Sequence, residues 1–253
     1  MDMDRRKFIK ACGLGLLGFG MVKAENVFAQ VAKGQYRSDL SMTGKRWAMV
    51  IDSRKCAGCN DCINACHKTH NVPEIKNQEE EVKWIWKEKF ENAFPDLNQR
   101  YLSADLEKRP FLLLCNHCEN PACVRVCPTK ATFKREDGIV MMDYHRCIGC
   151  RYCMAACPYG ARSFNFQDPR PFIPEINEKY PTRTKGVVEK CNFCTEQLSQ
   201  GLLPLCAQAC QKGAITCGDL NDPDSNVRKL LDAHITIQRK PNLGTFPGIY
   251  YIV

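Results

Sequence analysis

The stretch CIGCRYCMAACP, residues 147–158, holds four cysteines in the spacing C-x2-C-x2-C-x3-C and ends on a proline. The same cysteine spacing recurs at residues 56–66, and two related groups lie at 115–127 and 191–210. Together the four groups use all of the chain's 18 cysteines except Cys12 and Cys217. Each iron of a [4Fe–4S] cubane needs one soft ligand beside its sulfides. The spacing therefore predicts four [4Fe–4S] clusters.

Zinc sites and disulfides can also produce closely spaced cysteines. Structural zinc favours separate knuckles with four ligands each, and it does not require three close cysteines followed by a fourth and a proline. Disulfide frameworks need cysteines placed for pairwise bridging, and two-residue gaps in a row are too cramped for that. We therefore expect iron–sulfur clusters, and a chain whose folding depends on taking them up.

The ligand sets follow from a rule of two-cluster bacterial ferredoxins, in which the fourth cysteine of each run binds the other cluster. We apply this rule to an inner pair of groups nested inside an outer pair. The predicted sets are Cys56, Cys59, Cys62 and Cys210 for cluster 1; Cys66, Cys191, Cys194 and Cys206 for cluster 2; Cys115, Cys118, Cys123 and Cys157 for cluster 3; and Cys127, Cys147, Cys150 and Cys153 for cluster 4. The expected proline follows Cys127 and Cys157 but is missing after Cys66 and Cys210. The main alternative pairs the first group with the second and the third with the fourth.

The predicted fold class is α+β, a tandem and nested ferredoxin-like domain with two pseudo-twofold lobes of two clusters each. Short β-rich stretches at 46–51, 110–114, 138–142 and 186–189 precede the four groups, and the C-x3-C steps have helical spacing. This strand–loop–helix unit therefore repeats four times. The predicted segments are an outer lobe at 46–74 and 186–220, an insertion at 75–108, an inner lobe at 109–167, a proline-rich connector at 168–185 and a C-terminal tail at 221–253.

Residues 1–29 match a twin-arginine signal peptide. Arg5 and Arg6 precede a weakly apolar run that ends at Val22, and small residues precede a cut after Ala29. The run is too short for an ordinary membrane span. We expect the protein in the periplasm or on the extracytoplasmic face of the cytoplasmic membrane, held there by partners. Retention of the segment as an anchor is the alternative.

The formal charge of +8 does not indicate nucleic-acid binding. Five basic and three acidic residues in the first 29 contribute +2 of it. Four oxidised cubanes with their thiolates add about −8, because the charge of a bound inorganic group counts in the balance. The exported, cluster-loaded protein therefore carries about −2, which excludes a binding mode based on basic charge.

Several residues near the cysteine groups are candidates for smaller roles. Cys217 is expected to be a buried thiol rather than a ligand. Four histidines lie near the loops, and structural roles are expected for them: His67, His70, His117 and His145. Four cations could raise cluster potentials or could equally be solvated: Lys130, Arg146, Arg151 and Lys190. No arrangement of nucleophile, base or phosphate loop appears, so we predict no catalytic residues.

Residues 147–160 strongly resemble the four-cluster ferredoxin subunits of membrane oxidoreductases, which serve dimethyl sulfoxide, tetrathionate, polysulfide and formate–nitrite enzymes. The stretches at 190–194 and 218–223 resemble this family too, and so does the chain's ending, and the resemblance covers roughly residues 46–253. The family implies a non-catalytic subunit that conducts electrons. It also implies that cluster 4 lies nearest the membrane partner.

Two stretches narrow the resemblance. HNVPE at 70–74 and WIW at 84–86 are similar to the exported iron–sulfur subunits of Dsr-type membrane complexes of sulfur metabolism. This resemblance implies a multi-pass, quinone-reactive membrane subunit and a periplasmic multihaem cytochrome c as partners. The expected function is electron relay between the two. The alternatives are the electron-transfer subunit of a molybdopterin-dependent reductase and, from another class, a structural or redox-sensing assembly subunit.

Overall fold

The computed structural model describes residues 44–97 and 101–253. The predicted signal at residues 1–29 lies outside the described residues. In the two described ranges, no helix has both the length and the apolar character that crossing a membrane requires.

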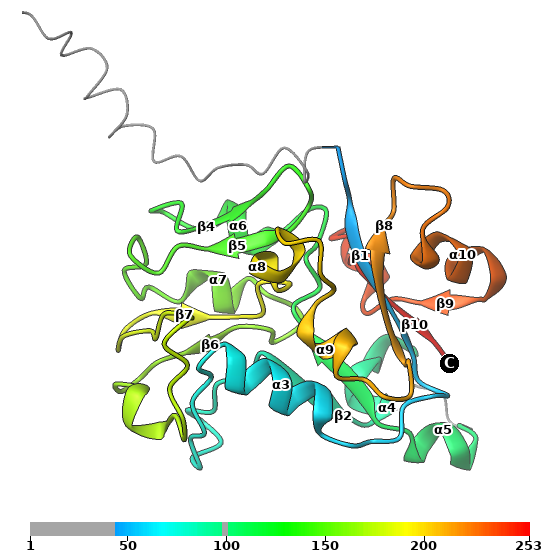
Figure 1. The fold of residues 1–253 in the computed structure, drawn as a ribbon, viewed down its shortest axis with the longest axis horizontal. Coiled ribbons are helices and arrows are strands. Elements are labelled where there is room, and N and C mark those ends of the chain that lie inside the picture. Colours follow the sequence, from blue (N-terminus) through cyan, green and yellow to red (C-terminus); the bar gives the residue numbers. More distant parts are fainter. Residues whose placement is uncertain (1–43, 98–100) are drawn as a thin grey trace, which may run out of the picture. The chain divides into compact units, whose positions relative to one another are not determined.

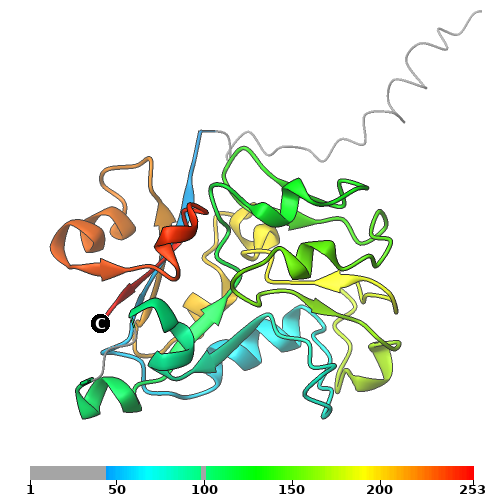
Figure 2. The same ribbon diagram turned by 180° about the vertical axis from the view of Figure 1, so that it is seen from behind.

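A four-stranded sheet contains the first and last strands of the described chain. Its order is β8 (Ile215–Asp219), β1 (Trp47–Asp52), β10 (Ile249–Ile252) and β9 (Thr236–Ile237). β1 runs parallel to β10 and antiparallel to β8. Figures 1 and 2 show this sheet together with helix α10 (Asn226–Ala233) at one side of the folded region.

The alternation of side chains along β1 gives this sheet two buried faces. Met49 and Ile51 join the main core, which also holds many of the cysteines. Ala48 and Val50 face the other way and pack with Val227 of α10 in a small second core. The Ser225 hydroxyl accepts a hydrogen bond from the Arg228 amide at the start of this helix, as an N-cap does.

The remaining strands form three antiparallel pairs. These pairs are β2 (Ile85–Glu88) with β3 (Phe111–Leu114), β4 (Thr132–Lys134) with β5 (Val140–Met142), and β6 (Ser163–Phe164) with β7 (Val188–Glu189). The four predicted strands are confirmed as β1, β3, β5 and β7, each just before a cysteine group. The segment expected as an insertion supplies β2, and the segment expected as a tail supplies β9 and β10.

Short helices follow the cysteine loops. Those that carry cysteines are α3 (Asp61–Thr69), α6 (Ala122–Arg125), α7 (Tyr152–Ala155) and α9 (Leu205–Gln208). α3 packs against α9, and α6 packs against α7. The other short elements are α4 (Phe90–Ala93), α5 (Ala104–Lys108), α8 (Thr195–Leu198) and the 3-10 turns Pro95–Leu97, Arg170–Phe172 and Pro241–Leu243.

The cysteine loops share a backbone feature that their sequences only partly reveal. The residue directly before the second cysteine of each group is left-handed: φ is +73° at Gly58, +41° at His117, +70° at Gly149 and +62° at Phe193. Glycine adopts this conformation readily, whereas other residues need support from their surroundings. At Phe193 and His117 this support is burial, with the two rings in edge contact at 5.0 Å. The four loops therefore repeat in backbone conformation even where their side chains differ.

Candidate iron–sulfur centres

The sixteen predicted ligand cysteines are all free thiols in the structure. Sites A, B, C and D denote the ligand sets predicted above for clusters 1, 2, 3 and 4. Site A is Cys56, Cys59, Cys62 and Cys210; site B is Cys66, Cys191, Cys194 and Cys206; site C is Cys115, Cys118, Cys123 and Cys157; and site D is Cys127, Cys147, Cys150 and Cys153. In each set, the first three cysteines of one group are joined by the last cysteine of the other group in the same pair.

Sites B and D each line a small pocket. The four site B thiols surround one with Met49, Ile85 and Leu114 on its walls. The four site D thiols surround another with Ile148, Arg151 and Val188. In sites B and D the four thiols of the predicted set thus lie around one pocket, and the fourth cysteine comes from a distant stretch of the chain.

The electrostatics of sites A and C show the same grouping. Burial, together with the charges of Cys210, Cys56 and Cys59, raises the pKa of Cys62 to about 11. Burial likewise raises the pKa of Cys118 to about 12, with the other site C thiols adding to the effect. Such thiolates repel one another unless a cation lies between them. The donor sets therefore suit iron, which supplies that positive charge and prefers sulfur ligands.

The four sites follow one another in order. Burial raises the pKa of Cys206 in site B, and the negative charge of Cys62 in site A also contributes to this increase. The pKa of Cys191 in site B is raised to about 12 by burial and then by Cys115 of site C. Burial raises the pKa of Cys153 in site D, and the negative charge of Cys123 in site C raises it as well. Each site thus has thiols close to those of the next, in the sequence A, B, C, D.

Backbone amides point at several of the sulfurs. The Phe193 amide donates to Cys191 Sγ at 3.4 Å, and the Ala214 amide donates to Cys210 Sγ at 3.3 Å. In site D, burial disfavours the Cys127 thiolate, yet the amides of Thr132, Thr129 and Ala131 and the Thr129 hydroxyl hold the pKa of this thiol below its ordinary value. Hydrogen bonds of this kind stabilise negative charge on sulfur, and they set cluster potentials.

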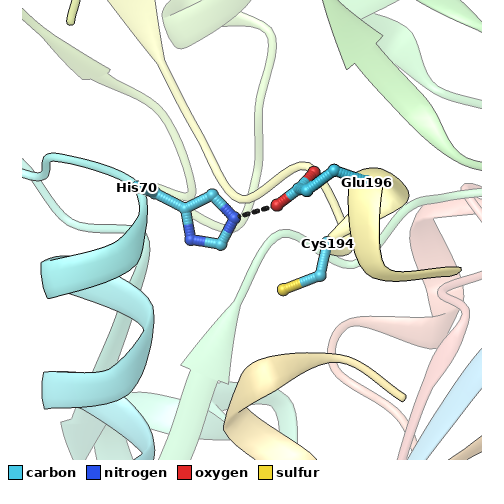
Figure 3. A group of neighbouring side chains, drawn as sticks. All are labelled: His70, Cys194 and Glu196. Atoms are coloured by element: carbon cyan, nitrogen blue, oxygen red, sulfur yellow. Dashed lines mark hydrogen bonds and ion pairs between the residues drawn. The ribbon is translucent and has the colours of Figure 1, made fainter. Parts of the chain in front are cut away.

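His70 lies next to Cys194 of site B and to Glu196 (Figure 3). Its ring is fully buried, stacks on Trp84 at 4.9 Å, and has Nδ1 2.9 Å from the Cys66 carbonyl oxygen and 3.7 Å from Cys66 Sγ. Nε2 lies 2.5 Å from Glu196 Oε1. His70, Cys194 and Glu196 are close enough together to hold a metal ion. Because both ring nitrogens already have protein partners, we assign the pair of His70 and Glu196 to the wall of site B.

A fully buried ion pair lies behind this wall. Arg183 Nη2 is 2.6 Å from Glu189 Oε2, and neither side chain is exposed. The Trp84 indole and the Asn165 amide also donate to the Glu189 carboxylate, at 3.0 and 2.5 Å. Arg183 donates to the carbonyl oxygens of His70 and Asn71. The network ties the proline-rich connector and Trp84 to the chain that leads into Cys191.

The cations singled out in the sequence differ in burial. Lys130, Arg146 and Arg151 are exposed. Lys190 is 1 % exposed, and its ammonium donates to the carbonyl oxygens of Val140 and Cys191. Three further buried cations in the described part of the chain, Arg162, Arg183 and Arg239, were not predicted from the sequence. For Arg162, no spacing rule connects it to the cysteines. Its position in the chain, five residues after Cys157, gave no signal of its burial.

The other residues that the sequence singled out are one cysteine and three histidines. Cys217 is buried in β8 next to site B, and it belongs to none of the four groups of thiols. His117 accepts a hydrogen bond from the Val140 amide through Nδ1, and burial together with Lys190 holds its pKa well below the ordinary value. Burial lowers the pKa of His67 to about 4, and His145 is exposed.

Comparisons with known proteins agree with this picture. Two models described as 4Fe-4S dicluster domains match residues 110–170 and 146–215. The Hdr-like menaquinol oxidoreductase iron-sulfur subunit 1 of Archaeoglobus fulgidus is 39 % identical, over 98 % of this chain and 97 % of that protein. The menaquinone reductase iron-sulfur cluster-binding subunit of Nitratidesulfovibrio vulgaris is 38 % identical over 82 % and 88 %. A tetrathionate reductase subunit of Salmonella typhimurium is 34 % identical over 100 % and 89 %.

Two of these relatives match almost the whole chain, and the two dicluster models together cover the three cysteine groups from Cys115 to Cys210. The relatives are iron–sulfur subunits, and the dicluster domains account for four [4Fe–4S] clusters. When bound, the clusters supply one-electron chemistry, and the protein holds them in place and sets their surroundings. The chain therefore belongs to the family of four-cluster, non-catalytic iron–sulfur electron-transfer subunits of membrane oxidoreductases.

Proposed function

We propose that this chain relays electrons, one at a time, between a quinone-reactive membrane subunit and a redox partner on the extracytoplasmic side, in a Dsr-type respiratory complex of sulfur metabolism. The observation that carries the relay is the continuous order of the four cysteine sites, A to D. Each neighbouring pair of sites has thiols within electrostatic reach of each other. A relay needs such continuity, whereas a purely structural role does not.

The ligand sets of the proposal are sites A to D as defined above. The grouping of thiols in the two pockets supports sites B and D, and the electrostatic neighbours of Cys62 and Cys118 support sites A and C. The packing of α3 on α9 and of α6 on α7 supports two nested lobes, because each contact joins the helices of one pair of groups. In this arrangement the outer lobe holds sites A and B, and the inner lobe holds C and D.

Iron and acid-labile sulfide analysis of the anaerobically purified full chain tests the ligand sets. We expect sixteen of each per polypeptide, and EPR of the reduced protein should resolve four interacting clusters. A content well below sixteen, reached without any loss of fold, would contradict the proposal.

The quinone link is supported by the names of two relatives, a menaquinol oxidoreductase subunit and a menaquinone reductase subunit. We propose a multi-pass quinone-reactive membrane subunit as one partner and a periplasmic multihaem cytochrome c as the other. In the purified complex, added menaquinol should reduce all four clusters rapidly, and the isolated chain should not respond. Slow or absent reduction in the intact complex would instead favour a structural or redox-sensing subunit.

Service to a molybdopterin-dependent reductase is the second candidate. It is favoured by relatives named as subunits of dimethyl sulfoxide, selenate and tetrathionate reductases. Affinity purification of the tagged chain from membranes separates the two candidates. Copurification of covalent haem supports the Dsr-type complex, whereas stoichiometric molybdenum supports the alternative.

We further propose export through the twin-arginine route. Arg5 and Arg6, the apolar run and the small residues before a cut after Ala29 support it. Substitution of both arginines by lysine should leave the cluster-loaded protein in the cytoplasm. Export of this variant at the wild-type level would contradict the proposal.

A further inference from the structure

Arg162 is a buried cation that has no carboxylate partner among the described residues. Arg162 is only 5 % exposed. The guanidinium donates to Thr132 Oγ1 at 2.8 Å and to Met142 Sδ at 3.9 Å. Burial of an unpaired charge is costly, and buried charges in proteins normally have an ionic partner. Arg183, which is also buried, has one in Glu189.

The neighbours of the guanidinium that can carry negative charge are cysteines from two different sites. Cys123 and Cys115 belong to site C, and Cys153 belongs to site D. Burial works against the charged arginine, but these three thiolates together raise its pKa above the ordinary value, and Cys123 also forms a hydrogen bond with it. Arg162 in turn opposes the burial that raises the pKa of Cys153. The contacts agree with this. Met142, which accepts from the guanidinium, lines the site D pocket together with Cys153, and α6, which carries Cys123, packs against α7, which carries Cys153. The guanidinium therefore lies at the junction of the two sites.

We propose that Arg162 is a fixed cation shared by the clusters of sites C and D, and that it makes both of them easier to reduce. The inference rests on the ligand sets proposed above. A four-thiolate cubane is negatively charged and becomes more so when it accepts an electron. A permanent positive charge in a buried, low-dielectric position favours the reduced form of each cluster it contacts.

Arginine suits this position because it does not lose its proton and because its planar fork reaches two groups at once. Transfer between the sites oxidises one cluster by one electron and reduces the other by one, with no change at the guanidinium. Since the cation contacts both sites, it shifts both potentials in the same direction. The driving force for transfer between the two clusters therefore changes less than either potential does.

Redox titration of the full cluster-loaded chain, monitored by EPR, tests the role of Arg162. In Arg162→Gln we expect the reduced-to-oxidised ratio at a fixed potential to fall at least tenfold for two clusters, which is a shift of about 59 mV for a one-electron couple. The clusters of sites A and B should keep their potentials. Arg162→Lys, which retains the charge, should return both shifted potentials toward the wild-type values.

Arg146→Gln is the matched control. Arg146 directly precedes a site D ligand, but its side chain is 66 % exposed and pairs with Asp143 at 3.3 Å. Solvent and counterions screen such a charge, so all four potentials should stay unchanged. A shift in this control as large as that of Arg162→Gln would overturn the inference, because surface charge alone would then explain the effect.

A second variant decides the question if Arg162→Gln loses iron. Met142→Glu places a carboxylate beside the guanidinium while Arg162 remains in place, and Met142→Gln controls for the change of side chain. Lower potentials at two clusters in the Glu variant alone support the inference. Unchanged potentials in Met142→Glu, or in an Arg162→Gln chain with sixteen irons, overturn it.

Failure of the ligand sets can be told apart from failure of this inference. Cys123→Ser and Cys153→Ser identify the EPR signals of sites C and D. If each variant perturbs a signal that also responds to a site A or site B substitution, the ligand sets are wrong. If the signals are assigned as proposed and Arg162→Gln moves neither of them, only the inference on Arg162 fails.

Discussion

Sites B and D contain the same kind of ligands in very different surroundings. The four site B cysteines are 4–8 % exposed, and His70, Phe193 and the buried pair of Arg183 and Glu189 lie around them. Three of the four site D cysteines are partly exposed, and the neighbouring Ile148 and Tyr152 are 67 and 62 % exposed. We infer that a cluster in site B exchanges electrons through its neighbours, whereas one in site D can meet a partner protein directly.

The test with the largest expected effect concerns Cys66, the fourth ligand of site B. Cys66→Ser should perturb or remove the cluster of Cys191, Cys194 and Cys206, because a hydroxyl is a poorer ligand for iron than a thiolate. Iron content should fall, and one EPR signal should change. Cys217→Ser is the matched control, since Cys217 is also buried beside site B and lies outside the ligand set. If Cys66→Ser and Cys118→Ser affected the same signal, the alternative pairing of groups would be correct.

The second test addresses the rigid surroundings of site B. Arg183→Met leaves Glu189 buried and unpaired, which should lower the free energy of unfolding by about 3–5 kcal/mol. Lys68→Met is the control, because Lys68 and Glu175 form an exposed pair with side chains 70 and 73 % accessible. Its effect should be below about 1 kcal/mol. Anaerobic denaturant unfolding measures both, and equal effects would mean that the buried network does not stabilise the region.

The third test addresses the loop of site D. Gly149 has φ +70°, and a Cβ there would lie 2.5 Å from the Gly186 carbonyl oxygen. Gly149→Ala should therefore cost more than the roughly 1–2 kcal/mol of left-handed strain alone, and the site D cluster should become labile. Gly160→Ala has a similar φ of +64° and no atom within 4 Å, so it isolates the strain. The difference between the two variants, in unfolding and in iron retention, measures how tightly the loop is packed.

The smallest expected effect concerns how deeply a cation near a cluster is buried. Lys190→Met should lower the potential of the site B cluster by about 59 mV, because a buried ammonium beside Cys191 is lost. Lys130→Met should leave potentials unchanged, since Lys130 is exposed and its charge is screened. EPR redox titration compares them. Equal shifts in the two variants would show that burial does not govern the influence of these cations.

The number and type of clusters were predictable from cysteine spacing, whereas the four ligand sets remain predictions. The rule that a fourth cysteine crosses to the other cluster placed Cys66 with Cys191 and Cys127 with Cys147, and the structure brings these thiols into common pockets. The strands before each group were predictable from short β-rich runs. Gly58 and Gly149 marked two left-handed loop positions, but nothing in the sequence marked His117 and Phe193, because their conformation is held by burial.

The sequence by itself determined the chemistry of this protein, because the number, softness and spacing of its thiolates leave few inorganic groups that could bind them. Only the tertiary structure decided which charges matter. Lys190 and Arg162 look no different in the chain from the exposed Lys130 and Arg146. The influence of a charge depends on the dielectric around it and on what lies within a few ångströms, and both are set by contacts between distant parts of the chain.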